Sequence, residues 1–101
     1  MNYRIKDLLA KSPSDELFLA EGWVRTKRDS KNVCFLELND GSCLKGLQIV
    51  IDKAALNNNE LITKITTGAA ISAKGNIVKS QGGNQAVEML SIDITIIKIE
   101  K

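Results

Sequence analysis

The 101-residue sequence contains no histidine and only two cysteines, Cys34 and Cys43. Histidine is the commonest general base near neutral pH and a frequent metal ligand, so its absence counts against an autonomous enzyme and against a metal site. Two cysteines are too few for a disulfide framework, and these two lack the spacing of a zinc motif. We therefore expect no catalytic residue, no metal and a reducing, cytoplasmic setting.

Long hydrophobic runs and a strong charge of either sign are also missing. No stretch approaches the roughly 20 apolar residues that span a bilayer, and the first residues lack the apolar segment of a signal peptide, so no membrane partner is expected. The net charge is +2, from 14 basic and 12 acidic residues, which is too small to indicate a nucleic-acid partner by itself. With 44% apolar residues, the composition predicts one soluble globular domain over residues 1–101.

The hydrophobic pattern predicts an order of helices and strands. Helical spacing of apolar residues predicts two helices, over 4–11 and within 52–68, the second ending at Gly68. Period-two alternation between turn signals predicts five strands: 17–27, 33–39, 47–51, 70–79 and about 85–99. Three isoleucines of the last strand are expected on one face: Ile92, Ile94 and Ile96.

Three strands, a helix and two strands is the connectivity of the OB-fold, a five-stranded Greek-key barrel. We therefore predict an all-β protein whose barrel occupies 17–99, with a helix between its third and fourth strands. An N-terminal helical extension, 1–14, precedes the barrel. Gly22, inside the first strand, marks a bend or a close approach of another strand.

Strand alternation predicts which side chains face outward. In 33–39 the second, fourth and sixth residues are apolar and form the expected core face, which leaves Phe35 outside. In 47–51 the leucine and the two isoleucines are expected inside, which leaves Gln48 outside. An exposed aromatic ring beside an exposed amide would form a stacking platform for a nucleobase, with a hydrogen-bonding group at its edge.

Four cations lie at the end of the first strand and in the turn into the second: Arg25, Lys27, Arg28 and Lys31. They are placed to reach the phosphates of a single nucleic-acid strand lying across Phe35. The same residues also fit structural roles. The phenylalanine could be covered by a loop or a partner, the cations could form a solvated hairpin with one charge offset by Asp29, and Trp23 is expected to be structural packing.

In this order and spacing, these residues resemble the N-terminal anticodon-binding domain of asparaginyl-tRNA synthetases, in the class II aspartyl, asparaginyl and lysyl subgroup. The likeness covers roughly residues 17–97 and rests on these segments: GWVRTKRDSK at 22–31, Phe35, NDGS at 39–42, LQIV at 47–50, TGA at 67–69 and KGNIV at 74–78. The aspartyl and lysyl relatives share the barrel and the outward phenylalanine, so those branches stay open. The segments DSK at 29–31 and DGS at 40–42 favour the asparaginyl branch.

The resemblance implies that the chain binds the anticodon loop of tRNA(Asn). Phe35 would stack on the central anticodon base, a uracil, and Gln48 would hydrogen-bond that base. Arg28, with Arg25 and Lys27, would hold the loop backbone or an adjacent base.

The resemblance extends to Glu88, which would lie in the region that reads the first anticodon base, while Lys31 belongs to the basic cluster. It also implies what the chain lacks, because the motifs of the class II catalytic domain are absent from it. We therefore expect no cofactor in this chain, because ATP and Mg²⁺ would bind only in the catalytic domain. That catalytic domain would be a partner of this chain in a full-length parent protein, which would be a homodimer. The alternatives are a free-standing general binder of single strands and an OB domain for protein contacts.

Overall fold

The computed structural model describes residues 2–54, 60–80 and 87–98. Its elements follow one another in this order: β1 (Asn2–Tyr3), α1 (Ile5–Leu9), β2 (Leu17–Asp29), β3 (Val33–Asn39), β4 (Leu47–Asp52), α2 (Glu60–Lys64), β5 (Ala70–Lys79) and β6 (Val87–Lys98). Strands β3 and β5 have the predicted bounds, whereas β2 and β4 run one or two residues further than predicted. The predicted ends of the last strand, at 85 and 99, lie outside the described residues.

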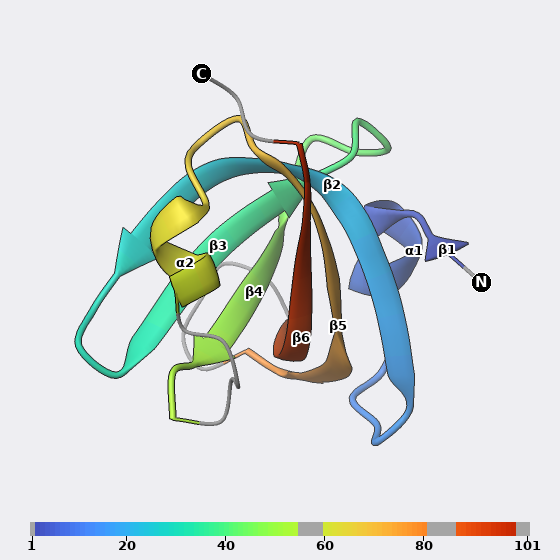
Figure 1. The fold of residues 1–101 in the computed structure, drawn as a ribbon. Coiled ribbons are helices and arrows are strands. Elements are labelled where there is room, and N and C mark those ends of the chain that lie inside the picture. Colours follow the sequence, from blue (N-terminus) through green and yellow to red (C-terminus); the bar gives the residue numbers. More distant parts are fainter. Residues whose placement is uncertain (1, 55–59, 81–86, 99–101) are drawn as a thin grey trace.

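Strands β2 to β6 close into a barrel (Figure 1). The pairs β2–β3, β3–β4 and β5–β6 are antiparallel, β4 pairs with β6 in parallel, and β2 closes the ring by pairing with β5. The short strand β1 adds to β2 in parallel. This is the connectivity of the OB-fold, so the predicted fold class is confirmed.

The length of β2 is what allows the barrel to close. Its first part, from Leu17 to Trp23, pairs with β5, and its last part, from Trp23 to Asp29, pairs with β3. Gly22 lies where the strand passes from one partner to the other. A Cβ atom on Gly22 would overlap the carbonyl oxygen of Asn39, so the predicted close approach is confirmed and requires glycine.

Both helices are shorter than predicted, but their apolar faces are buried as expected. Ile5 and Leu8 of α1 have no exposed surface, and Ile62 of α2 packs into the same core. α2 ends at Lys64 rather than at Gly68, which instead takes a φ of 90° in the turn before β5. Figure 1 shows α2 beside β2 and β3, on the opposite side of the barrel from α1. Neither described helix is long or apolar enough to cross a bilayer.

The turn after β3 fastens α1 to the barrel. The Asp40 carboxylate accepts hydrogen bonds from the Ile5 backbone N–H at 2.9 Å and from the Ser42 hydroxyl at 2.6 Å. The Ser42 hydroxyl in turn accepts the Lys6 backbone N–H at 3.0 Å. Burial by itself would raise the pKa of Asp40, but these hydrogen bonds outweigh it and hold the pKa below its ordinary value. The segment that favoured the asparaginyl branch thus has a structural role.

The last strand departs from the predicted alternation. Lys74 pairs with Asp93 but Gly75 pairs with Ser91, so Ile92 is an extra residue, a β-bulge. Ile92 is therefore 51% exposed, whereas Ile94 is buried. The prediction that Ile92 shares one face with Ile94 and Ile96 was wrong, because the bulge reverses the alternation at that point.

Candidate nucleic-acid interface

A second bulge, in β2, sets the direction of the basic side chains. Val24 is opposite Leu38 and Thr26 is opposite Glu37, so Arg25 is an extra residue between two paired positions. A bulge of this kind reverses which residues of the strand face the core. The reversal therefore changes the faces to which Lys27 and Arg28, further along β2, point.

Beyond the bulge, Lys27 is opposite the buried Leu36, and Arg28 is opposite Phe35. Residues directly opposite one another in an antiparallel pair point to the same face. Arg28 therefore joins Phe35 on the outer face, while Lys27 points toward the inside of the barrel.

Lys27 is engaged by the far end of α2. Its ammonium donates hydrogen bonds to the carbonyl oxygens of Ile62 and Ile65, at 2.6 and 2.9 Å. These bonds satisfy backbone carbonyls near the end of a short helix, where a cation is favourable. The structure thus separates the Lys27 ammonium from the arginines with which the sequence grouped it, because the bulge lies between them.

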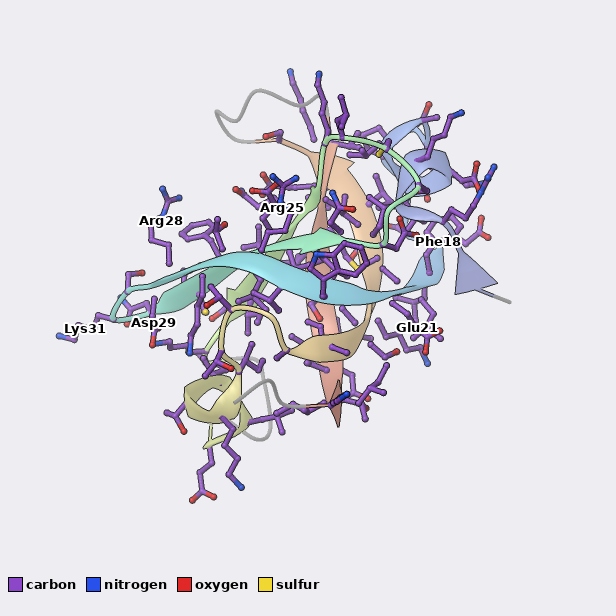
Figure 2. All side chains as sticks on the ribbon, turned by 90° about the horizontal axis from the view of Figure 1, so that it is seen from above. Phe18, Glu21, Arg25, Arg28, Asp29 and Lys31 are labelled. Carbon is purple, nitrogen blue, oxygen red and sulfur yellow. The ribbon has the colours of Figure 1, made fainter. Side chains whose placement is uncertain are left out.

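Phe35 faces outward, as predicted, and its ring is partly covered by Arg28. The Arg28 guanidinium carbon lies 4.6 Å from the ring centre, in cation–π geometry. Figure 2 shows Arg28 and Arg25 rising on the same side of β2, with α2 on the other side. The ring therefore lies on the side of β2 from which the two arginines project, with the Arg28 guanidinium over it.

An apolar row extends from Phe35 across three strands. Phe35 is opposite Val50 of β4, which is opposite Leu90 of β6. The first two side chains are partly buried, and Leu90 is exposed. Such a row offers apolar surface to the face of a base or a sugar.

A polar row lies beside the apolar one. Glu37 of β3 is opposite Gln48 of β4, and the Gln48 amide nitrogen donates a hydrogen bond of 3.2 Å to Oε1 of Glu88 in β6. Glu88 is only 5% exposed. The outer face therefore carries an apolar row beside an amide that is hydrogen-bonded to a buried carboxylate.

An open groove of about 660 Å³ is hollowed into this face. Its lining brings together five of the seven predicted site residues, and adds one further cation, Lys45; the five are Phe35, Gln48, Arg25, Arg28 and Lys27. Positive charge around an exposed aromatic ring is the arrangement that proteins use to bind single-stranded nucleic acid.

The connection between β3 and β4 forms one wall of the groove. Arg25 Nη1 donates a hydrogen bond of 3.0 Å to the carbonyl oxygen of Leu44 and lies 3.7 Å from Oε2 of Glu37. Lys45, in the same connection, is exposed, and its ammonium forms no hydrogen bond or ion pair within the described chain. The sequence analysis missed Lys45, although a basic residue just after the turn at 39–42 was a usable signal.

Two charged residues lie at the tip of the β2–β3 hairpin rather than in the groove. Figure 2 shows Asp29 and Lys31 at this tip. Asp29 forms an ion pair with Lys53, and the hydrogen bond from Lys53 holds the pKa of Asp29 below its ordinary value. The negative charge of Asp29 is thus offset chiefly by Lys53, with a smaller contribution from Lys27.

The two cysteines have structural surroundings. Cys34 is buried in the core, and burial raises the pKa of its thiol, which makes it a poor nucleophile. The Cys43 thiol donates to the carbonyl oxygen of Lys45 at 3.0 Å. Within residues 2–54, 60–80 and 87–98, no three histidine, cysteine, aspartate or glutamate side chains gather as a metal site.

Curated proteins similar to this chain are asparagine–tRNA ligases. That of Solibacter usitatus is 47% identical over 92 residues, which are 91% of this chain and 20% of that protein. That of Syntrophobacter fumaroxidans is 50% identical over 78 residues, which are 76% of this chain and 17% of that protein. The chain therefore spans about one fifth of the length of the curated relatives that it matches.

Solved structures with the same fold include two asparaginyl-tRNA synthetases. That of Pyrococcus horikoshii, complexed with asparaginyl-adenylate, has a TM-score of 0.84 at 15% identity and covers 99% of this chain and 23% of its own. The structure from Entamoeba histolytica has a TM-score of 0.79 at 23% identity, and the match covers 100% of this chain and 24% of that chain. An OBody bound to hen egg-white lysozyme has a TM-score of 0.80 at 12% identity, and the match covers 98% of this chain and 95% of the OBody chain.

At 12–23% identity the solved structures establish only that this chain has the same fold. Membership of a family rests instead on a match of the sequence to a family model. Residues 18–99 match the tRNA anti-codon family model, described as an OB-fold nucleic acid binding domain. The matched range contains the whole groove and all five barrel strands except Leu17, the first residue of β2. The chain therefore belongs to the tRNA anti-codon family of OB-fold nucleic acid binding domains.

Proposed function

We propose that this chain binds the anticodon loop of tRNA(Asn) and selects that tRNA for an asparagine–tRNA ligase. The observation that carries the proposal is the groove, which brings Phe35 and Gln48 together with Arg25, Arg28 and Lys45. The names of the curated relatives direct the choice of RNA. Unstacked loop bases are the usual targets of sequence-specific RNA recognition, because their faces and edges are accessible.

In this proposal the central anticodon base stacks on Phe35. A stacked base contributes about 1–3 kcal/mol on an aromatic side chain. With the Arg28 guanidinium 4.6 Å from the ring centre, no base fits between the two groups. A base that stacks on this face of the ring therefore displaces Arg28, whose charge is then free to pair with a neighbouring phosphate.

The other residues of the groove divide into edge readers and phosphate contacts. Gln48 hydrogen-bonds the edge of the stacked base, and Arg25 and Lys45 approach the backbone on either side of it. Lys27 also lines the groove, but its ammonium donates to the carbonyl oxygens of Ile62 and Ile65, so in this proposal it acts through the position of α2 and the hairpin rather than by contact. An RNA contact for Lys31 stays a prediction, for a phosphate lying beyond the groove at the hairpin tip.

The ligation reaction belongs, in this proposal, to the part of the relatives outside the matched fifth. ATP and Mg²⁺ would bind there, a catalytic domain and a second copy of the parent would be the protein partners, and the cytoplasm would be the compartment. The groove residues bind and orient RNA, and we propose no bond making or breaking for them.

The test compares two labelled ligands in a binding titration: the anticodon stem–loop of tRNA(Asn) and poly-pyrimidine DNA of equal length. We expect tighter binding of the stem–loop, with an affinity that falls as salt rises, because phosphate contacts release counterions. Equal affinities would identify a general binder of single strands. A lack of salt-dependent RNA binding would point instead to a protein-contact role, such as that of the lysozyme-bound OBody.

A further inference from the structure

Trp23, the one tryptophan of the sequence, lies on the outer face of the barrel that also carries Phe35. On β3, Phe35 and Asn39 are an even number of positions apart, so their side chains point to the same face. Trp23 is opposite Asn39 and Arg28 is opposite Phe35, and opposite residues share a face. Trp23 and Arg28 are an odd number of positions apart on β2, so the extra residue Arg25 is what allows both to face outward.

A hollow of about 380 Å³ lies beside Trp23. It shares two lining residues with the groove, Arg25 and Leu44, so it continues the groove along the surface of the barrel. Three residues of the turn after β3 complete the lining: Asn39, Gly41 and Cys43. We call this the Trp23 hollow.

The turn that lines the Trp23 hollow is held by its own hydrogen bonds. Oδ1 of Asn39 accepts the Gly41 backbone N–H at 2.7 Å, and Nδ2 of Asn39 donates to the Cys43 carbonyl oxygen at 3.4 Å. Gly41 has a φ of 83°, which favours glycine, and a Cβ atom there would lie 3.5 Å from Cη2 of Trp23. One edge of the indole thus packs on a fixed turn, so the ring is oriented before any ligand binds.

The rest of the indole is available to a ligand. Trp23 is 43% exposed, and Leu44 of the same hollow is 94% exposed. Within residues 2–54, 60–80 and 87–98, the Trp23 indole forms no hydrogen bond and no cation lies over it, in contrast to Phe35. A tryptophan N–H usually has a partner when it is buried. This exposed ring offers a ligand both a stacking face and an N–H donor.

Positive charge flanks the Trp23 hollow on two sides. Arg25 lines it where it meets the groove. On the other side, Trp23 is opposite Ala70 of β5, which is opposite the exposed Lys98 of β6. The Lys98 ammonium forms no ion pair within the described chain, and the Asp40 carboxylate of the turn is directed to α1 instead. An open aromatic ring between cations favours a nucleic-acid strand as the ligand over an apolar protein surface.

We propose that the Trp23 hollow is a second base-binding site, in which a nucleotide flanking the anticodon stacks on the indole. The inference deepens the proposed function and rests on it. Along β3, Phe35 and the residue opposite Trp23 are about 13 Å apart, at about 3.3 Å per residue. A stacked strand rises only about 3.4 Å per nucleotide and an unstacked one extends further, so one nucleotide step does not span this distance. With the central base on Phe35, the base on Trp23 therefore lies outside the triplet.

The emission of Trp23 reports on this site alone, because the sequence contains no other tryptophan. The anticodon stem–loop of tRNA(Asn) is titrated into the protein while the emission is followed, and the anisotropy of a dye-labelled copy measures binding in parallel. We expect the emission to be quenched with the dissociation constant that anisotropy gives. We also expect Trp23 to become less accessible to acrylamide in the complex.

Two further stem–loops carry an abasic site in place of the nucleotide on one or the other side of the triplet. We expect one of them to bind about 5- to 100-fold more weakly, as for the loss of one stacked base, and to leave the emission unquenched. A different base at that position is expected to change the affinity by no more than about threefold, because every base has an aromatic face.

Trp23→Leu is expected to weaken binding of the intact stem–loop by the same factor. It should bind the abasic RNA as tightly as the intact one, because the two changes remove the same contact. Trp23→Phe keeps an aromatic face and is expected to bind within about threefold of the unaltered protein. Circular dichroism and thermal unfolding establish that each variant is folded. If Trp23→Leu is not, the abasic RNAs and the emission of the unaltered protein carry the test.

Four outcomes separate the inference from the proposed function. If anisotropy detects no binding of the intact stem–loop, both fail. If the stem–loop binds while the emission is unquenched and both abasic RNAs bind as tightly as the intact one, the Trp23 site alone is overturned. If Trp23→Leu weakens the intact and the abasic RNAs equally, Trp23 acts through the shape of the groove and the inference is wrong. Emission that shifts with protein concentration in the absence of RNA would instead assign the hollow to a second copy of the chain.

Discussion

The guanidinium carbon of Arg28 lies 4.6 Å from the centre of the Phe35 ring, on the outer face of the barrel. The two residues are opposite one another on β2 and β3 because the bulge at Arg25 reverses the alternation of β2. Without that extra residue, Lys27 rather than Arg28 would face outward next to the ring. The bulge thus brings together the cation and the ring on which the proposed RNA contact depends.

Replacement of Phe35 tests the stacking contact. Phe35→Leu keeps an apolar side chain beside Val50 but removes the aromatic face, and we expect the affinity for the anticodon stem–loop to fall about 5- to 100-fold. Fluorescence anisotropy measures the affinity. Val50→Leu, which keeps an apolar side chain in the same row, is the control and is expected to retain binding within about twofold. Unchanged affinity for Phe35→Leu would contradict the stacking role.

Lys45 lies in a wall of the groove, and no sequence motif indicated it as a site residue. Its replacement tests whether that wall contacts RNA. Lys45→Ala is expected to weaken binding of all RNA loops to a similar degree and to reduce the slope of log affinity against log salt by about 0.7, as for one lost phosphate contact on a single strand. As a control, Lys64→Ala removes another exposed lysine, from α2 and outside the groove. Equal effects of the two substitutions would show that only net charge matters.

Lys27 is expected to affect stability rather than RNA affinity. Lys27→Met leaves the carbonyl oxygens of Ile62 and Ile65 without their donor, and the free energy of unfolding is expected to fall by about 1–2 kcal/mol. Urea denaturation measures this loss, with Lys74→Met on the exposed face of β5 as control. A folded Lys27→Met protein that binds the stem–loop tenfold more weakly would instead assign Lys27 a direct contact.

Asp40 gives a pH-dependent prediction. Its pKa is lower in the folded protein than the ordinary 3.8, so its carboxylate stabilises the fold above that pH, and the contribution is lost as the pH falls through the lower, folded value. We expect Asp40→Asn to destabilise the protein by about 1 kcal/mol at pH 7, and by much less near pH 2. Asp15→Asn, at an exposed loop position, is the control. A destabilisation by Asp40→Asn that is the same at both pH values would contradict the ionic origin of the effect.

Regular alternation made much of the barrel predictable. Every second residue is buried from 34 to 38 in β3 and from 71 to 77 in β5, and both strands were predicted with their observed bounds. The outward direction of Phe35 and Gln48 follows from the same pattern. The order of the elements was then sufficient to identify the OB-fold.

The direction of Lys27 and of Ile92 was not predictable in this way. Each follows a bulge or occupies one, and a bulge arises from the pairing of two strands rather than from the pattern of either. The contact between Gln48 and Glu88 joins residues 40 positions apart, and it depends on the parallel register of β4 and β6. Local periodicity contains no information about that register.

The central claim is that the groove recognises the middle base of an anticodon. The most direct measurement is the dissociation constant of the unaltered protein for the tRNA(Asn) anticodon stem–loop and for the same RNA with cytosine in place of the central uracil, at one salt concentration. We predict binding about 5- to 100-fold weaker for the altered RNA. Equal dissociation constants for the two RNAs would contradict the claim.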